Sequence, residues 1–146
     1  MLLKFLIAAT LTFLCLAGCK SNEAGKKLVG KWNSGTGSEQ MIAEFSADGK
    51  LALNARAPTG PMWMTILGTY SLSGDTINFT YTDMRMTPDD PKQQAIANMA
   101  LKATKQRMLD VFIKNDSSDQ LSWKSDDQFV MTDAKGKPQT FDRVKK

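Results

Sequence analysis

The sequence predicts a mainly β domain, an antiparallel meander barrel or sandwich of about eight strands, with one inserted amphipathic helix near residues 90–113. Three observations support this fold class. Apolar and polar residues alternate in short runs, which is the pattern of strands with one buried face. Turn signals such as Asp48-Gly49 and Gly74-Asp75 separate consecutive runs. A single segment has helical spacing instead, and it interrupts the series of strands.

The first hairpin follows an initial strand expected at residues 29–33. An Asp-Gly pair at 48–49 lies between two alternating runs, and such a pair favours a tight hairpin because it accepts positive φ. The residues expected to share one face are Met41, Ala43 and Phe45 before the turn and Leu51, Leu53 and Ala55 after it.

A second hairpin is predicted around Gly74-Asp75, and further strands follow near the C-terminus. Its inner face would carry Met62, Met64, Ile66, Tyr70 and Leu72 before the turn and Ile77, Phe79 and Tyr81 after it. The last strands are marked by Leu121, Trp123, Phe129, Met131 and Phe141.

The inserted segment has the features of a helix. Asp90 can cap it, with Pro91 at the first helical position and Gln93 at the capping-box spacing. We expect the helix to close one end of the barrel or to cover a sheet face; a mobile lid or a basic helix resting on anionic lipid are the alternatives. Its apolar stripe comprises Ala97, Ala100, Leu101, Thr104, Met108, Val111 and Phe112.

The N-terminal residues 1–18 have the layout of a cleaved secretory signal peptide: a positive charge, an apolar run and small residues at its end. The run is shorter than the roughly 20 apolar residues of a membrane-spanning helix. The segment LAGC at 16–19 resembles the lipobox of bacterial lipoproteins. This resemblance implies that the thiol of Cys19 carries a diacylglycerol and that Cys15 leaves with the leader. An ordinary signal peptide with a chance cysteine is the alternative.

The predicted organisation is therefore a signal peptide at 1–18, a lipidated cysteine and tether at 19–28, and one β-domain at 29–146. Acyl chains on Cys19 would hold the chain on a bacterial membrane. In Gram-negative bacteria the resemblance implies the outer membrane, facing the periplasm, because Lys20 is not the aspartate that retains lipoproteins at the inner membrane. The net charge of +4 comes from dispersed bases, so no nucleic-acid partner is expected.

Gly30-Lys31-Trp32, the series of hairpins and Arg143 together resemble the lipocalin-like (calycin) pattern. The resemblance implies that Gly30, Trp32 and Arg143 close the base of a barrel. In that arrangement the tryptophan of the first strand fills the base, and the arginine of the last strand packs over it. A guanidinium can do this by bonding first-strand carbonyls and stacking on the indole.

The composition argues against catalysis. The chain has no histidine, which removes the commonest general base, and the mature domain would contain no thiol. Its carboxylates cluster in turns, where bonding to nearby backbone accounts for them. We therefore expect neither enzymatic activity nor a cofactor.

Three binding functions remain. The first is a small apolar ligand inside the barrel, lined by Met41, Phe45, Leu53, Met64, Tyr70, Phe79 and Tyr81. The second is a solid core, with the surface acting as an interaction or inhibitor module for another envelope protein. The third is Cu(I), because thioethers are soft ligands and two Met-x-Met pairs each place two of them on one strand face: Met62, Met64, Met84 and Met86.

Overall fold

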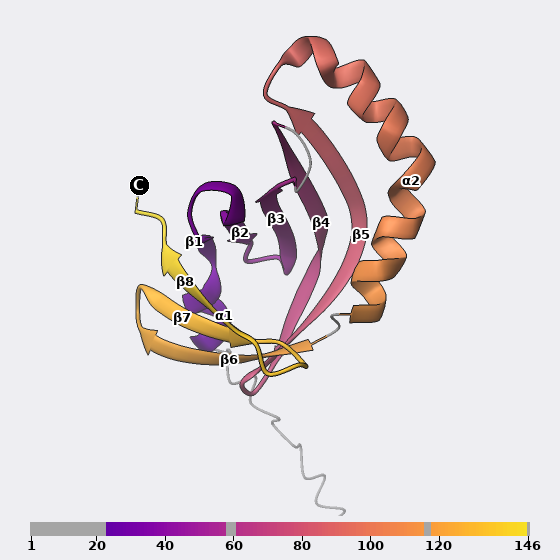
Figure 1. The fold of residues 1–146 in the computed structure, drawn as a ribbon. Coiled ribbons are helices and arrows are strands. Elements are labelled where there is room, and N and C mark those ends of the chain that lie inside the picture. The colour runs from indigo at the N-terminus through magenta and orange to yellow at the C-terminus, as the bar shows by residue number, and fades with distance from the viewer. Residues whose placement is uncertain (1–22, 58–60, 116–117, 146) are drawn as a thin grey trace, which may run out of the picture.

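The computed structural model describes residues 23–57, 61–115 and 118–145, with the side chains of residues 112–115 excepted. Eight antiparallel strands form one sheet in which each strand pairs with the next and β8 returns to β1, so the sheet closes into a barrel (Figure 1). The predicted fold class is confirmed. Cys19 and the leader lie outside the described residues.

The elements follow one another in a simple meander. The helical segments are α1 (Glu23–Leu28), η1 (Gly37–Glu39), η2 (Pro91–Gln93) and α2 (Gln94–Asn115). The strands are β1 (Gly30–Ser34), β2 (Met41–Phe45), β3 (Lys50–Arg56), β4 (Met62–Ser73), β5 (Thr76–Pro88), β6 (Ser118–Ser125), β7 (Gln128–Thr132) and β8 (Pro138–Arg143).

Helix α1 is a departure from the sequence prediction, which placed residues 19–28 in a lipidated tether. Residues 23–28 form a helical turn and a half, and Leu28 at its end is fully buried. The carbonyl of Leu28 accepts a hydrogen bond of 2.7 Å from Nε1 of Trp32. Because this contact needs the helix to lie against the barrel, α1 belongs to the folded domain.

Both predicted hairpin turns are present. Gly49 (φ 80°) connects β2 to β3, and Gly74 (φ 61°) connects β4 to β5. Glycine adopts these left-handed angles without steric cost. The pairing of Phe45 with Leu51 across the first turn keeps the predicted inner-face residues together.

The pairing of β4 with β5 contains one register shift, between Leu67 and Gly68. Gly68 pairs with Tyr81, whereas Leu67 pairs with Asp83, so β5 has one extra residue, Thr82. Such a bulge reverses the inward and outward alternation of the bulged strand beyond it.

The bulge decides which side chains of upper β5 face the interior. Tyr81 faces inward below the bulge, and Met84 and Met86 face inward above it. Without the extra residue, Asp83 and Arg85 would occupy those inward positions. The bulge therefore keeps an ionised pair outside and two thioethers inside.

Helix α2 lies along the edge of β5 and follows its curve (Figure 1). Among the described residues, three pairs, from Thr76 to Asn78, join β5 to β6, and no described strand pairs with β5 beyond them on that side. Gln94 at the start of α2 donates to the Met86 carbonyl at 3.0 Å. The helix thus covers a sheet edge, which would otherwise be open to unwanted pairing.

The buried stripe of α2 is narrower than predicted. Ala97, Leu101 and Leu109 are buried and Met108 is partly buried, whereas Ala100, Thr104 and Val111 are exposed. The side chain of Phe112 lies outside the described residues. The stripe is narrow because α2 packs on the edge of one strand and not on a broad sheet face.

The half of the barrel that lies next to α1 is filled by aromatic side chains. Trp32, Phe45, Phe129 and Phe141 are all at most 1% exposed. Trp32 and Phe129 meet edge to face with centroids 4.6 Å apart, and Phe129 stacks on Phe141 at 5.0 Å. In the part of the chain that is described, no helix has both the length and the apolar character needed to cross a membrane.

Candidate binding site at the barrel mouth

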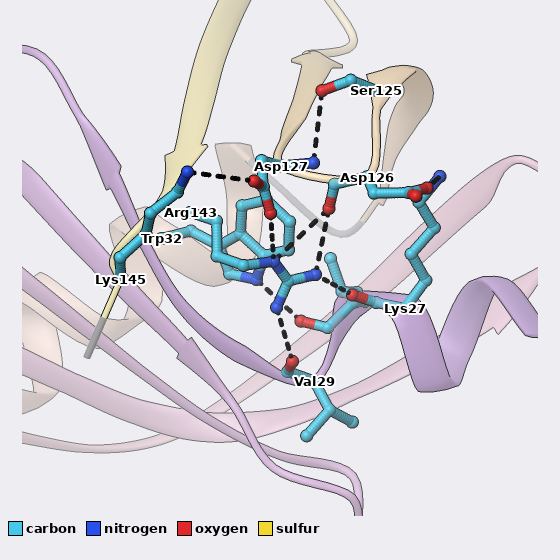
Figure 2. Close-up of polar contacts among 9 residues, drawn as sticks. Lys27, Val29, Trp32, Ser125, Asp126, Asp127, Arg143 and Lys145 are labelled. Atoms are coloured by element: carbon cyan, nitrogen blue, oxygen red, sulfur yellow. Dashed lines mark hydrogen bonds and ion pairs between the residues drawn. The ribbon is translucent and has the colours of Figure 1, made fainter.

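The end of the barrel that lies next to α1 is closed by Arg143 and Trp32. The guanidinium of Arg143 lies 4.1 Å from the centroid of the Trp32 ring (Figure 2). It donates to the carbonyl of Val29 at 3.2 Å and to that of Lys27 at 2.7 Å. It also contacts the 126–127 turn, through a carbonyl and through the carboxylate of Asp127 at 3.2 Å. A cation this well coordinated serves the structure and is not available to a ligand.

Gly30 and Asp126 complete this closure. Gly30 has φ 136°, and a Cβ there would lie 3.0 Å from Nη1 of Arg143, so a side chain would displace the guanidinium. Asp126 pairs with Lys27 at 2.7 Å, and this hydrogen bond lowers the pKa of the Asp126 carboxyl. Gly30 and Trp32, which the lipocalin-like resemblance assigned to barrel closure together with Arg143, thus both lie against the Arg143 guanidinium.

The seven predicted ligand-lining residues share the inner face but fall into two groups. Phe45, Phe79 and Tyr81 are buried in the core, and Met41, Leu53, Met64 and Tyr70 are only partly buried. Tyr70 is fixed by its hydroxyl, which donates to the Ser46 carbonyl at 2.9 Å. Burial, followed by the charge of Asp48, raises the pKa of Tyr70 above its ordinary value.

A cavity of about 670 Å³ lies beside the β1–β2 and β7–β8 connections, at the end of the barrel away from Arg143. This end is called the mouth. This volume is in the range of small-molecule sites. Its walls come from the upper ends of β1, β2, β6, β7 and β8 and from η1. The lining residues are Ser34, Gly35, Glu39, Met41, Asp119, Met131, Asp133, Lys137, Pro138, Gln139 and Thr140.

The cavity exists because the seam between β1 and β8 is short. Of the described residues, only the pairs Trp32–Arg143 and Asn33–Asp142 join the two strands across it. Above these pairs, β1 ends at Ser34 and turns into η1, so the upper part of β8 has no partner on that side in the described residues. The seam opens there, and Ser34 and Gln139 both line the cavity.

The polar groups of the mouth surround two thioethers. Ser34 pairs with Met41 on one side of the seam, and Met131 pairs with Gln139 on the other. Nε2 of Gln139 approaches Sδ of Met41 at 4.0 Å, which links the two sides. Ser34 is 5% exposed and lines the cavity.

Of these lining residues, only Met41 belonged to the predicted site. The strand alternation contained the signal for two others, since Ser34 lies two positions after Trp32 and Gln139 two before Phe141. Polar residues at inward positions are informative, because most inward positions are apolar. The opening of the seam, however, depends on where β1 and β8 end, and that does not follow from alternation.

The Met-x-Met pairs also meet on the inner face. Met64 of β4 lies directly opposite Met86 of β5, and Met84 lies opposite Ile66 one step along the ladder. Met62 pairs with Pro88 at the upper end. Met84 is 1% exposed and belongs to the core cluster, so apolar packing accounts for its position.

A second depression, of about 860 Å³, lies beside the closed end. Its walls include Lys31 and Glu44, which pair with each other across β1 and β2 at 3.3 Å, and Arg143. These side chains are already engaged in holding strands together. The mouth differs in that its lining combines the thioethers of Met41 and Met131 with the side chains of Ser34 and Gln139.

No protein-family model matches this chain, and no curated protein matches its sequence. Within the described residues, no group of three or more His, Cys, Asp or Glu side chains is placed to hold a metal ion.

Proposed function

We propose that this chain is a non-catalytic, lipid-anchored binding protein of a bacterial envelope, and that the mouth of its barrel holds a small amphipathic molecule. The observation that carries this proposal is the cavity of about 670 Å³, lined by the thioethers of Met41 and Met131 and by the polar side chains of Ser34 and Gln139. A concave site in which polar groups converge beside a few apolar side chains is suited to a small amphipathic molecule.

The proposal is more specific than the sequence prediction of an apolar ligand, because it gives the ligand a polar group and a place in one part of the barrel. The lower interior is occupied by aromatic side chains, so a ligand would occupy only the upper part. Its apolar portion would lie on Met41 and Met131, and its polar group would bond to Ser34 and Gln139.

Anchorage rests on the leader and on Cys19. Helix α1 begins at Glu23, four residues after that cysteine, so the barrel would stand close to the membrane surface. We propose the outer membrane, facing the periplasm, where the organism is Gram-negative. Several acyl chains on one cysteine would make the anchorage effectively permanent.

Native mass spectrometry of the full chain, purified from its own envelope in a mild neutral detergent, tests the proposal. We expect a fraction of molecules to carry an additional small mass that dissociates on activation. The fraction of molecules that carry the mass should fall in Ser34→Leu, which fills the mouth with an apolar side chain. It should persist in Ser73→Leu, a control at an exposed residue that ends β4 and does not line the cavity. A chain that carries no mass, and that no small amphiphile stabilises against heat, would refute the proposal.

A second candidate, an interaction module for an envelope protein, is favoured by one observation. Ile96 and Met99 on the outer side of α2 are 65% and 66% exposed. A photo-cross-linker at position 99 should then capture a defined envelope protein that a cross-linker at Asp142 does not capture. Equal labelling from both positions would argue against a docking face on α2.

A further inference from the structure

We propose that two copies of this chain pair through their α2 helices, which run antiparallel and meet along the side that faces away from the barrel. The pairing does not depend on a ligand at the mouth. Helix α2 forms the outermost edge of the described fold, so its outer side is open to another molecule (Figure 1).

Helix α2 carries apolar residues on both of its sides. Leu101 faces the barrel and is buried, whereas Ile96 and Met99 face away from it and are 65% and 66% exposed. Exposed alanines extend the apolar surface around these two side chains: Ala95, Ala100 and Ala103. An exposed apolar surface of this kind on a soluble domain marks a contact with another molecule.

The exposed residues of the outer side have the spacing of a two-helix seam. Intervals of four and three residues alternate along α2 and the turn before it, and this spacing keeps the residues on one side of the helix. The apolar members lie in the middle of the seam and the charged ones at its two ends. The six exposed residues are Lys92, Ile96, Met99, Ala103, Gln106 and Asp110.

An antiparallel register fits large side chains to small ones. When Met99 lies opposite Ala103 of the second copy, the same spacing places Ile96 opposite Gln106 of that copy. Gln106 already donates to a carboxylate of its own helix at 2.9 Å, so its amide has a partner within each copy. Because the pair has two-fold symmetry, each of these layers occurs twice.

The two ends of the seam supply charge complementarity. Lys92 and Asp110 are exposed and take part in none of the ion pairs among the described residues. In the antiparallel register each lies opposite the other in the second copy, so the ammonium–carboxylate pair forms twice. Parallel helices would place like charges opposite each other at both ends. The charges therefore select an antiparallel second copy.

The shape of α2 suits a contact centred on its middle. The helix follows the curve of β5 and is convex on its outer side (Figure 1), so two copies would approach most closely near Met99 and Ala103. Small side chains at this point shorten the distance between two packed helices. Since a contact along one helix is smaller than a standard interface, we expect a weak dimer, with a dissociation constant of ~10–100 µM.

An exchange of charges tests the pairing, measured by sedimentation equilibrium of the full chain in a density-matched neutral detergent. Lys92→Glu and Asp110→Lys each create two pairs of like charge, and each should weaken the dimer ~10-fold. The double variant Lys92→Glu/Asp110→Lys restores both pairs with reversed sign and should dimerise within ~3-fold of wild type. Lys124→Glu, at an exposed residue of β6, is the matched control and should leave the dimer unchanged.

The two single variants should keep α2 folded. A carboxylate at position 92 lies near the start of the helix and an ammonium at position 110 near its end, and the helix dipole favours both signs. The capping hydrogen bond from the backbone N–H of Lys92 to Asp90, at 3.0 Å, does not involve the exchanged side chain. Thermal midpoints of the variants check this expectation.

Recovery of the dimer in the double variant is the result that supports the pairing. A wild type that stays monomeric well above the expected dissociation constant overturns it. Loss of the dimer in both single variants without recovery in the double variant overturns the antiparallel register, and a dimer that none of the charge changes affects places the contact elsewhere on the molecule. The small mass expected at the mouth should be the same in all four variants, so failure of the pairing leaves the proposed function standing.

Discussion

Gly68 of β4 lies so close to Thr80 of β5 that a Cβ at position 68 would come within 2.3 Å of the Thr80 carbonyl oxygen. No side chain fits there without moving backbone. The contact occurs next to the register shift between Leu67 and Gly68, where β5 takes in its extra residue. This glycine therefore permits the bulge that turns Met84 and Met86 toward the interior.

Gly68→Ala should consequently destabilise the barrel by about 2 kcal/mol or more, as overpacking of a close backbone contact does. Urea denaturation followed by tryptophan fluorescence measures the effect. Thr69→Ala, an exposed neighbour on the same strand, is the control and should stay within about 0.5 kcal/mol of wild type. Equal stability of both variants would mean that the bulge does not depend on the missing side chain.

Arg143→Lys should cost about 2 kcal/mol, because an ammonium cannot bond the Lys27 and Val29 carbonyls while stacking on Trp32. Trp32 fluorescence should also shift as the closed end admits water. The matched control is Arg85→Lys, whose guanidinium is largely exposed and lies 3.8 Å from its partner Asp83. A similar small loss in both variants would show that the closure does not need the planar guanidinium.

Acid should loosen α2 from β5. The hydrogen bond from the Lys105 ammonium, and then that from the Met84 backbone, lower the pKa of Asp83 below its ordinary 3.8. A lowered folded pKa stabilises the fold above the unfolded value, and this contribution disappears as the pH falls through the folded one. Since the pair is partly exposed, its loss should cost about 0.5 kcal/mol.

The measurement compares urea midpoints at pH 6 and pH 3 for the wild type and Asp83→Asn. The pKa values of Asp48 and Asp126 are lowered as well, by Lys50 and Lys27, so both proteins lose stability at low pH. The wild type should lose slightly more than the variant. Identical losses of stability in the two proteins would show that the pair between Asp83 and Lys105 does not make the packing of α2 on β5 depend on pH.

The methionines of upper β4 and β5 should act as apolar packing. The double variant Met64→Leu/Met86→Leu, which keeps volume and removes both thioethers, should retain stability within about 1.5 kcal/mol. We expect Cu(I) competition with a chromogenic chelator to give the same result for wild type and variant. Stoichiometric Cu(I) retention by the wild type that is lost in the variant would instead support the copper alternative.

Cys19→Ala should move the chain from the membrane fraction to the soluble fraction of the envelope and abolish labelling by a radioactive fatty acid. Cys15→Ala, in the leader that would be removed, is the control and should leave both unchanged. Membrane association of the Cys19→Ala chain would contradict lipid anchorage.

The sequence was sufficient for features that depend on local pattern. The turns at Gly49 and Gly74, the sharing of one face by Phe45 and Tyr70, and the inserted helix all follow from spacing and turn chemistry. The Trp32–Arg143 contact came from resemblance alone. The alternation of apolar and polar residues shows which face of a strand is buried, but it does not show that β1 pairs with β8.

Other features of the fold depend on where individual strands and helices end in the folded chain, which the sequence pattern does not show. The bulge at Thr82 could not be located, because either phase of β5 presents an alternating face. The mouth could not be predicted because it requires β1 to end at Ser34 before β8 can pair beyond Asp142. Helix α1 was read as a tether because six residues carry too little periodicity to show a helix.

The most direct test of a ligand in the mouth is the mass retained by the chain when the cavity is narrowed. Met41→Trp replaces a half-buried cavity residue, and Met99→Trp makes the same change on the exposed side of α2. Native mass spectrometry should show the bound small mass in wild type and Met99→Trp, and its loss from a folded Met41→Trp. Retention of the same mass by Met41→Trp would contradict binding at the mouth.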